Sequence, residues 1–253
     1  MARPRRCSCS PDLPFRIEIV PETGSTSTDL LARLAAGEAA QEALWLVAER
    51  QTAGRGRQGR SWLDAPGNFM GSTAVRLLPQ DPAAASLSFV AALATYEAVL
   101  GHVSAPRALQ LKWPNDLLLG GAKLAGILLE RAGDAAVIGI GVNLAGAPYL
   151  LDRPARHLAQ MGPAPDRDAF ARDLAASFDR ELDRWRQFGL ESLLARWLAA
   201  AHPVGTSLSV HGADGTRITG DFAGLEPDGA LRLRLADGAC RVIHAGDVTI
   251  EGG

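Results

Sequence analysis

The centre of the chain most constrains the fold, because residues 109–142 predict an antiparallel meander. Gly120-Gly121 and Gly133-Asp134 lie between short apolar segments, and such pairs are typical of the tight turns that join antiparallel strands. Pro114-Asn115-Asp116 separates an earlier pair of apolar segments. We expect the strand after the first glycine pair to cover 123–130, with another strand behind the next turn.

Helical patterns follow the meander, and a strand-like pattern follows the helical one. After His202-Pro203 the chain consists of short alternating segments broken by glycine turns. Strands spaced by about eight to twelve residues are typical of a small all-β barrel. We therefore expect a disordered leader over 1–14, a large domain over 15–202 and a small domain over 203–253. The other expected elements are strands over 15–20, 44–48 and 69–78 and helices over 81–100, 168–188 and 190–201.

Charge and hydropathy exclude several classes of protein. With 26 basic and 28 acidic residues among 253, the net charge of -2 provides no overall field for nucleic acid or an acidic membrane surface. No segment approaches the roughly 18 consecutive apolar residues that span a bilayer. Met1–Pro14 lacks the apolar core of a signal peptide. We expect a cytoplasmic protein that binds neither DNA nor membranes.

The cysteines and histidines predict neither a disulfide framework nor a structural metal. The three cysteines, Cys7, Cys9 and Cys240, form an odd set, and two of them lie in the leader. The five histidines lack the spacing of zinc ligands.

Lysine and asparagine are scarce, and their positions are informative. Lys112 and Lys123 are the two lysines, and Asn68, Asn115 and Asn143 are the three asparagines. Lysine carries a compact, movable charge, whereas arginine carries a broad planar one. The composition therefore draws attention to residues 112–143.

Gly54–Gly59 matches the G-x-G-x-x-G pattern of dinucleotide-binding folds, but that pattern requires the glycines to open a helix. Pro66-Gly67 would break a helix almost at once. Arg55, Arg57 and Arg60 instead favour a loop whose guanidinium groups bind a polyanion and which is mobile without it. A solvated arginine loop that grips RNA is the alternative.

The segment Lys112–Asp116 concentrates a cation, an amide and a carboxylate between two apolar strands. Such polar density is costly unless it is used. Asp116 offers the oxygen ligands that Mg²⁺ prefers. An ordinary turn that uses Asn and Asp explains the same residues equally well.

Lys123 is the one cation near the start of an otherwise apolar strand. Alternation with period two places Lys123 on the same side as Ala125 and Ile127. The lysine either guards a sheet edge or presents its ammonium group to a ligand. The small residues Ala125 and Gly126 leave room for a ligand and favour the second interpretation.

Four segments together closely resemble the biotin protein ligase family: Glu49–Trp62, Lys112–Asp116, Lys123–Ile127 and Gly139–Asn143. The resemblance covers residues 17–253. It implies an α+β catalytic domain like that of class II aminoacyl-tRNA synthetases, as in biotin and lipoate ligases, followed by an SH3-like β-barrel.

The resemblance also implies an activity. Biotin and ATP, with Mg²⁺, would give biotinyl-5'-AMP, and a lysine of a biotin carboxyl carrier protein domain would then receive the biotinyl group. A homodimer is compatible with the resemblance. A lipoate ligase of the same superfamily and a non-catalytic biotin sensor that binds DNA are the alternatives.

Roles for individual residues follow from the resemblance alone. Lys123 would bridge the biotin carboxylate and the α-phosphate, with Arg57 and Lys112 beside the phosphates. Asp116 would be a metal or amine contact. The other expected binding residues are Ser25, Thr26 and Gln51 at the ureido ring, Gly54, Arg55 and Arg60 in the closing loop, Trp62 and Asn143 at adenine, Asn115 at the phosphates, and Gly126.

Two features depart from the family pattern. Ser27 stands where the family often has asparagine, which affects a helix cap and not the chemistry. About fourteen residues precede the first expected strand, fewer than a winged helix-turn-helix needs, so the repressor function of some relatives is not supported.

Overall fold

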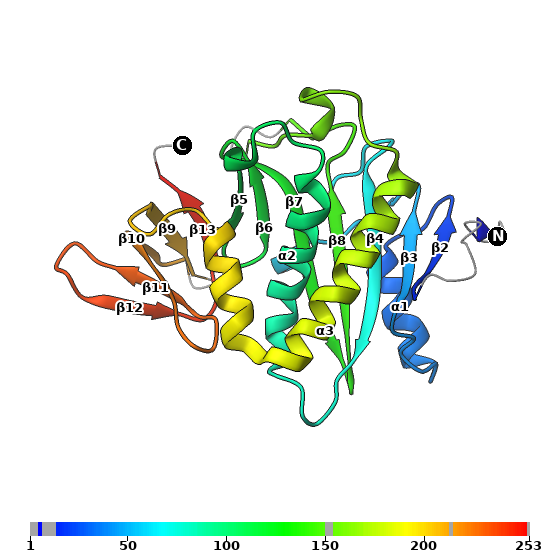
Figure 1. The fold of residues 1–253 in the computed structure, drawn as a ribbon, viewed down its shortest axis with the longest axis horizontal. Helices are drawn as coiled ribbons and strands as arrows, with labels where there is room; N and C mark the ends of the chain where they lie inside the picture. Colours follow the sequence, from blue (N-terminus) through cyan, green and yellow to red (C-terminus); the bar gives the residue numbers. More distant parts are fainter. Residues whose placement is uncertain (1–4, 7–13, 150–153, 213–214, 252–253) are drawn as a thin grey trace.

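A computed structural model describes residues 5–6, 14–149, 154–212 and 215–251. An eight-stranded mixed sheet carries two helices on one face, and a five-stranded antiparallel sheet lies at the C-terminal end (Figure 1). The expected α+β fold with a small C-terminal β domain is confirmed.

The large sheet pairs strands that are distant in the sequence. Only β2 and β3 run parallel among the pairs of this sheet within the described residues. In spatial order the strands are β1 (Arg5–Arg6), β2 (Arg16–Val20), β3 (Leu44–Ala48), β4 (Phe69–Arg76), β8 (Ala135–Val142), β7 (Ala122–Ala132), β6 (Asp116–Leu119) and β5 (Leu109–Lys112).

The smaller sheet begins a few residues after the last helix. Its strands in spatial order are β12 (Cys240–Ile243), β11 (Leu231–Arg234), β10 (Arg217–Leu225), β9 (Ser207–His211) and β13 (Asp247–Ile250). The helix ends at Ala200 and β9 starts at Ser207, and the expected boundary at 202–203 stays a prediction.

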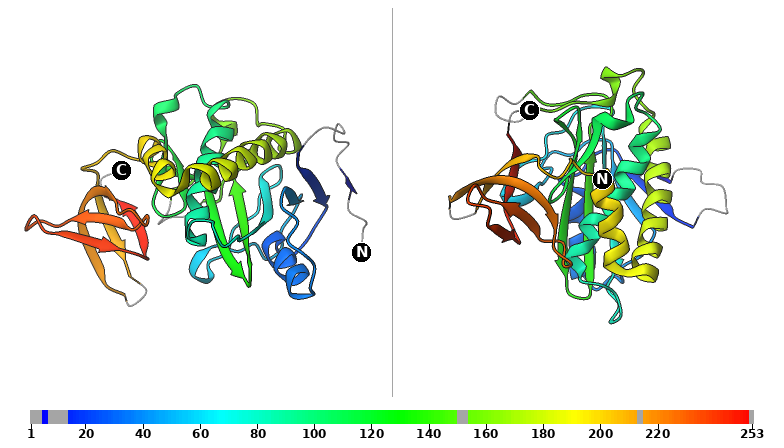
Figure 2. Two further views of the ribbon diagram at one scale, coloured as in Figure 1. Left: turned by 60° about the horizontal axis from the view of Figure 1, so that its bottom comes forward. Right: turned by 60° about the vertical axis from the view of Figure 1, so that its left-hand side comes forward.

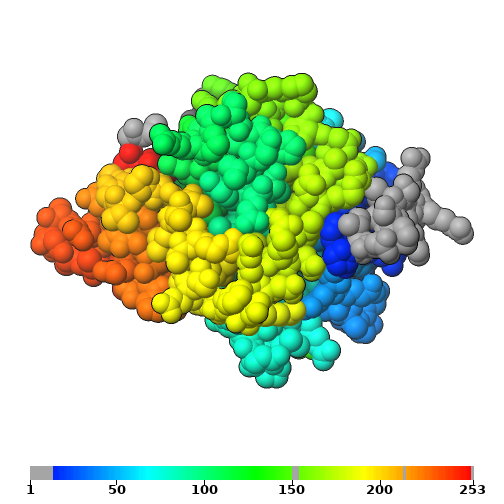
Figure 3. Space-filling model, in the orientation of Figure 1, coloured from blue at the N-terminus to red at the C-terminus, as the bar shows by residue number. Residues whose placement is uncertain are grey.

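Three helices cover the two faces of the large sheet. α2 (Leu87–Leu100) and α3 (Arg167–Ala200) pack on one face and hide most of it in the space-filling view (Figure 3). α1 (Thr26–Ala35) packs on the other face, where Leu30 contacts a small cluster that includes Val137.

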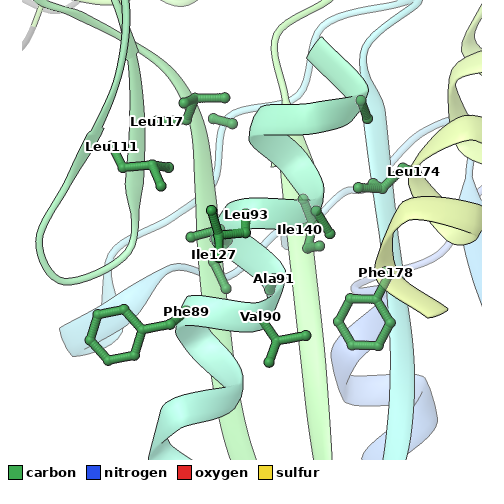
Figure 4. Close-up of a cluster of buried hydrophobic side chains, with 14 of the residues drawn as sticks. Phe89, Val90, Ala91, Leu93, Leu111, Leu117, Ile127, Ile140, Leu174 and Phe178 are labelled. Carbon is green, nitrogen blue, oxygen red and sulfur yellow. The ribbon is translucent and has the colours of Figure 1, made fainter. Parts of the chain in front are cut away.

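The main core lies between α2, α3 and the sheet. α2 buries ten of its fourteen residues, and its alanines let the helix approach the strands closely. Figure 4 shows side chains of α2 beside the strand residues Ile127 and Ile140, with Leu174 and Phe178 of α3 next to them. This core fixes which residues of β7 and β8 are left for the opposite face.

The predicted meander is confirmed, because β5 to β8 are successive antiparallel neighbours. One helix expectation needs adjustment. The helix expected from 81 begins at Leu87, because Asp81 accepts from the N–H of Leu78 and Ser86 bonds back to Ala83 in a tighter turn. The two later helices, expected over 168–188 and 190–201, are confirmed as the two parts of α3, which is interrupted where Gly189 adopts a φ of 73°.

The leader is described only in part. Arg5 and Arg6 pair with Ile19 and Glu18, and residues 1–4 and 7–13, with Cys7 and Cys9, lie outside the described residues. Cys240 is an exposed free thiol. Across the described ranges, no helix is long and apolar enough to cross a membrane.

His202 lies where the chain passes from α3 to the smaller sheet and is only 2% exposed. Its ring packs against Phe222 with centroids 4.5 Å apart, and its backbone N–H donates to the Leu111 carbonyl (3.2 Å). Burial lowers the pKa of His202 to about 4, and the charge of Lys112 acts in the same direction.

Because of His202, the free energy of unfolding should fall by about 2 kcal/mol between pH 7 and pH 5. The folded pKa of about 4 lies below the ordinary 6.5, so the unfolded chain binds the proton first as the pH decreases. Urea unfolding of His202→Leu should lack this component. The exposed control His244→Leu should retain it, and an unchanged slope in His202→Leu would contradict the assignment.

Candidate active site

A cleft of about 1440 Å³ lies on the face of the large sheet opposite α2 and α3. The smaller sheet stands on this side of the molecule (Figure 2, right). The cleft is lined by the start of α1, residues 55–60 (the arginine segment), the β5–β7 region and β8, together with residues 247–250 of β13. Segments from the whole length of the chain therefore form one site.

Alternate residues of β8 form the floor of the cleft. Gly139 and Gly141 of β8 share one face with Asn143, which follows the end of the strand, since side chains alternate along a strand, while Ile140 faces α2. A Cβ atom on Gly139 would lie 2.3 Å from Ser27 Oγ, and one on Gly141 would lie 2.3 Å from Trp62 Cε2. Glycine at both positions lets these side chains rest directly on the strand.

A hydroxyl cluster, formed by Thr26, Ser27 and Ser72, lies at the Gly139 end of the floor. Ser72 Oγ is 2.7 Å from Thr26 Oγ1 and 2.9 Å from Ser27 Oγ, and all three residues are buried. The Thr26 N–H donates to Gln51 Oε1 (2.8 Å), and Ser25 caps α1. This end of the cleft is polar and uncharged.

Asp116 holds both lysines in the middle of the cleft. Its Oδ2 is 2.9 Å from Lys112 Nζ, and its Oδ1 is 2.6 Å from Lys123 Nζ. Burial alone would raise the pKa of Asp116, but the two ammonium groups outweigh it and lower the pKa to about 2. Lys123 is 36% exposed and its Nζ lies 5.9 Å from the Trp62 ring centroid, so it is accessible from the cleft.

The arginine segment is held by oxygen atoms of the chain itself. Arg55 pairs with Glu130 (2.7 Å), and Arg57 donates to Asn115 Oδ1 (3.1 Å). Burial lowers the pKa of Arg57. These contacts offset the mutual repulsion among the guanidinium groups of this segment.

β13 and the residue before it bind three of the cleft's cations. Arg57 donates to the Gly246 carbonyl (3.4 Å), and Lys112 donates to the Val248 carbonyl (2.7 Å). Between these carbonyls, Asp247 pairs with Arg60 at 2.5 Å. The smaller sheet therefore positions cations that belong to the larger domain.

The expected side for Lys123 was wrong, because a β-bulge interrupts the alternation. Leu117 pairs with Ala125 but Leu118 pairs with Lys123, so β7 has one extra residue there. Ala125 and Ile127 belong to the core against α2, while Lys123 faces the cleft. The bulge gives the lysine the same side as Gly126.

Comparison with known proteins agrees with this geometry. The model of the biotin/lipoate A/B protein ligase family matches residues 21–143, and that of the biotin protein ligase C terminal domain matches residues 210–250. A biotin–acetyl-CoA-carboxylase ligase of Paracoccus denitrificans is 41% identical over 91% of this chain and 98% of its own. The chain belongs to the biotin protein ligase family. A ligase of the same name from Mycobacterium tuberculosis is 38% identical over 92% of this chain and 88% of its own.

Solved structures of this ligase family share the fold. Biotin protein ligase from Aquifex aeolicus, in complex with biotin and ATP, has a TM-score of 0.81 at 24% identity and covers 93% of this chain and 99% of its own. The ligase from Leishmania major in complex with biotinyl-5-AMP has a TM-score of 0.60 at 26% identity, covering 94% and 100%.

The cleft of this biotin protein ligase homologue brings together all but one of the predicted site residues. Gly54 does not line the cleft. A Cβ atom there would lie 2.6 Å from the Trp62 carbonyl oxygen, so glycine at this position allows the two backbone segments to pack closely. The predicted residues that line the cleft are Ser25, Thr26, Gln51, Arg55, Arg57, Arg60, Trp62, Lys112, Asn115, Asp116, Lys123, Gly126 and Asn143. Their individual roles stay predictions.

Asn143 is engaged with the chain itself. Its Nδ2 donates to the Arg156 carbonyl (3.1 Å), and its Oδ1 accepts from Asn68 Nδ2 (3.4 Å). Trp62 lies on Gly141 and near Lys123, in the middle of the floor. Neither placement by itself assigns the two residues to adenine.

Sequence reasoning missed two residues that line the cleft, Ser72 and Asp247, and one that supports Asn143, Asn68. Ser72 carried no distinctive sequence signal. Asp247 could not be recognised from the sequence because its partner Arg60 lies 187 positions away. Asn68, which is fully buried and accepts from the N–H of Ala145 and of Gly146, was marked by the scarcity of asparagine.

Asp116 does not fit a magnesium ion as its ligand. Both carboxylate oxygens face ammonium groups, which repel a cation and already satisfy the negative charge. Among the described residues, no group of three His, Cys, Asp or Glu side chains could hold a metal ion.

Asp247→Asn should loosen the arginine segment, because Arg60 loses its charged partner. Both side chains of the pair are about one-third exposed, so the ion pair stabilises the segment by at most about 1 kcal/mol. Its loss should make trypsin cleavage within residues 55–60 up to about 5-fold faster. Limited proteolysis with mass spectrometry measures it. Asp221→Asn, at an exposed position of β10, is the control, and equal cleavage of both variants would contradict the contact.

Proposed function

We propose that this chain is a biotin–acetyl-CoA-carboxylase ligase that forms biotinyl-5'-AMP from biotin and ATP and passes the biotinyl group to a carrier lysine. Relatives 41% and 38% identical bear this name, and the Leishmania major ligase binds biotinyl-5-AMP. The carrying observation is the Lys112–Asp116–Lys123 cluster, which lies between an uncharged hydroxyl cluster and three arginines.

The first step joins two anions. A biotin carboxylate oxygen attacks the α-phosphorus, the bond from that phosphorus to the bridging oxygen of the β-phosphate breaks, and pyrophosphate leaves. Fixed cations lower this barrier because they face the negative charge as it develops. Lys123 reaches the cleft from one side beside the Asp116 carboxylate, and Arg57 and Lys112 lie near that same carboxylate. The reacting carboxylate therefore belongs in the middle of the floor.

The biotin head fits the uncharged end. Its ureido ring is neutral and forms hydrogen bonds, and Ser25, Thr26 and Gln51 offer donors and acceptors without a net charge. The dithiolane ring of lipoate has no comparable donors and would leave such groups without partners. The buried hydroxyl cluster thus favours biotin over lipoate.

The second step transfers the biotinyl group. The amine nitrogen of the carrier lysine attacks the carbonyl carbon of the mixed anhydride, the bond from that carbon to the phosphate oxygen breaks and AMP leaves, and the amine proton passes to water. With a pKa of about 2, Asp116 is a weak base. Asp116 is therefore better suited to orient the amine of the carrier lysine than to accept its proton.

Magnesium enters as part of the substrate in this proposal. MgATP carries its ion on phosphate oxygens and water, so the protein needs no dedicated cage. The cationic residues of the cleft then bind the remaining phosphate charge.

The decisive measurement is mass spectrometry of a biotin carboxyl carrier protein domain incubated with the chain, biotin and MgATP. The expected result is the mass of one biotinyl group on a single lysine, dependent on ATP. Lipoate in place of biotin should give no comparable product. Transfer of lipoate alone would replace this function with its closest alternative.

Lys123→Arg should reduce pyrophosphate release by on the order of 10² to 10³, the typical loss for a transition-state donor. Arginine keeps the charge but spreads it over a larger plane, which cannot fit beside Asp116 and Trp62 in the same way. Arg107→Lys, an exposed change outside the cleft, is the control. Near-normal release by Lys123→Arg would remove Lys123 from the proposed role.

A further inference from the structure

Arg156 lines the cleft at the end opposite the hydroxyl cluster. The floor runs from Gly139, under Ser27, through Gly141, under Trp62, to Asn143, which bonds to the Arg156 carbonyl. Four residues of an extended strand span about 14 Å. Arg156 is therefore well separated from the proposed ureido site.

The backbone fixes Arg156 in place without help from its side chain. Its N–H donates to the Lys123 carbonyl (2.9 Å), and the Lys123 N–H donates to the Pro154 carbonyl (2.9 Å). Lys123 and Ala155 thus form a short parallel bridge. The residue that we place at the reacting carboxylate is tied directly to the segment that carries Arg156.

The turn between β6 and β7 provides a platform for the guanidinium group. A Cβ atom on Gly120 would lie only 2.7 Å from Arg156 Nη1 and 3.4 Å from its Cζ. Gly120 also has a φ of 55°, which favours glycine. The absent side chain lets the guanidinium rest on the turn, while Arg156 stays exposed to the cleft.

Arg156 differs from the other cations of the cleft in its contacts. Within the ranges that the structure describes, its guanidinium has no carboxylate partner. The other five have oxygen partners: Arg55 with Glu130, Arg57 with Asn115, Arg60 with Asp247, and Lys112 and Lys123 with Asp116. Within the described residues, a ligand can therefore engage Arg156 without breaking an ion pair.

We propose that Arg156 binds the nucleoside part of ATP, with its guanidinium plane stacked on the purine base. The proposal rests on the function above, which places the biotin head at Gly139 and the carboxylate at Lys123. The phosphates then face Lys112 and the arginine segment, and the base extends toward Asn143. Arginine stacks well on aromatic rings because its charge is planar and weakly hydrated.

The test compares Arg156→Ala and Arg156→Lys with the unmodified chain by calorimetric titration with ATP and with inorganic tripolyphosphate. Arg156→Ala should weaken ATP binding by about 10-fold and leave tripolyphosphate binding within 2-fold. Arg156→Lys keeps the charge but not the plane and should recover little. Arg107→Ala, exposed and outside the cleft, should match the unmodified chain.

Enzyme kinetics supply the second readout. The KM for ATP should rise in Arg156→Ala, while the KM values for biotin and for the carrier domain stay unchanged. Unchanged ATP binding, equal losses for ATP and tripolyphosphate, full recovery in Arg156→Lys, or a rise in the carrier KM alone would each overturn the proposal. If the unmodified chain bound ATP but formed no adenylate, the proposed function would fail, and the titrations would still decide the role of Arg156.

Discussion

The Asp116 carboxylate between two ammonium groups is the constraint on which the site depends. One negative charge, largely withdrawn from water, faces Lys112 and Lys123, and the pKa of about 2 reflects how strongly the two cations favour its ionised form. Without the carboxylate, two neighbouring ammonium groups would repel each other in a poorly solvated place. The carboxylate therefore sets where positive charge can be held beside the cleft.

The meander is the part of the fold that satisfies this constraint. Lys112 and Asp116 are direct partners across the β5–β6 hairpin, and Asp116 pairs with Gly126 of β7. The bulge then turns Lys123 toward the same face. β13 completes the arrangement, because the Val248 carbonyl accepts from Lys112. A local hairpin thus assembles the charges, and a distant segment fixes their geometry.

The sequence predicts the local features well and the long-range ones poorly. The glycine pairs predict the meander because turn chemistry depends on adjacent residues. The face of Lys123 escaped prediction, since alternation assumes a regular ladder and one extra residue reverses it. The residues that the motifs named, apart from Gly54, line one cleft, and their roles stay predictions. Asp247 escaped prediction because its partner Arg60 lies 187 positions away in the sequence. Arg156 escaped because only the fold brings its segment beside Lys123.

The internal pairing of the cleft's cations also shapes its response to ligands. The net charge of the protein is only -2, yet the cleft holds several cations side by side. Each ion pair with an acidic residue offsets the repulsion between neighbouring cations. A triphosphate must therefore exchange internal oxygen partners for its own, and its affinity is the difference between two sets of contacts. At the hydroxyl cluster biotin exchanges internal hydrogen bonds and not ion pairs, because no charge is held there. The two halves of the cleft accordingly differ in kind: the biotin end selects by hydrogen bonding, and the nucleotide end by exchange of charge.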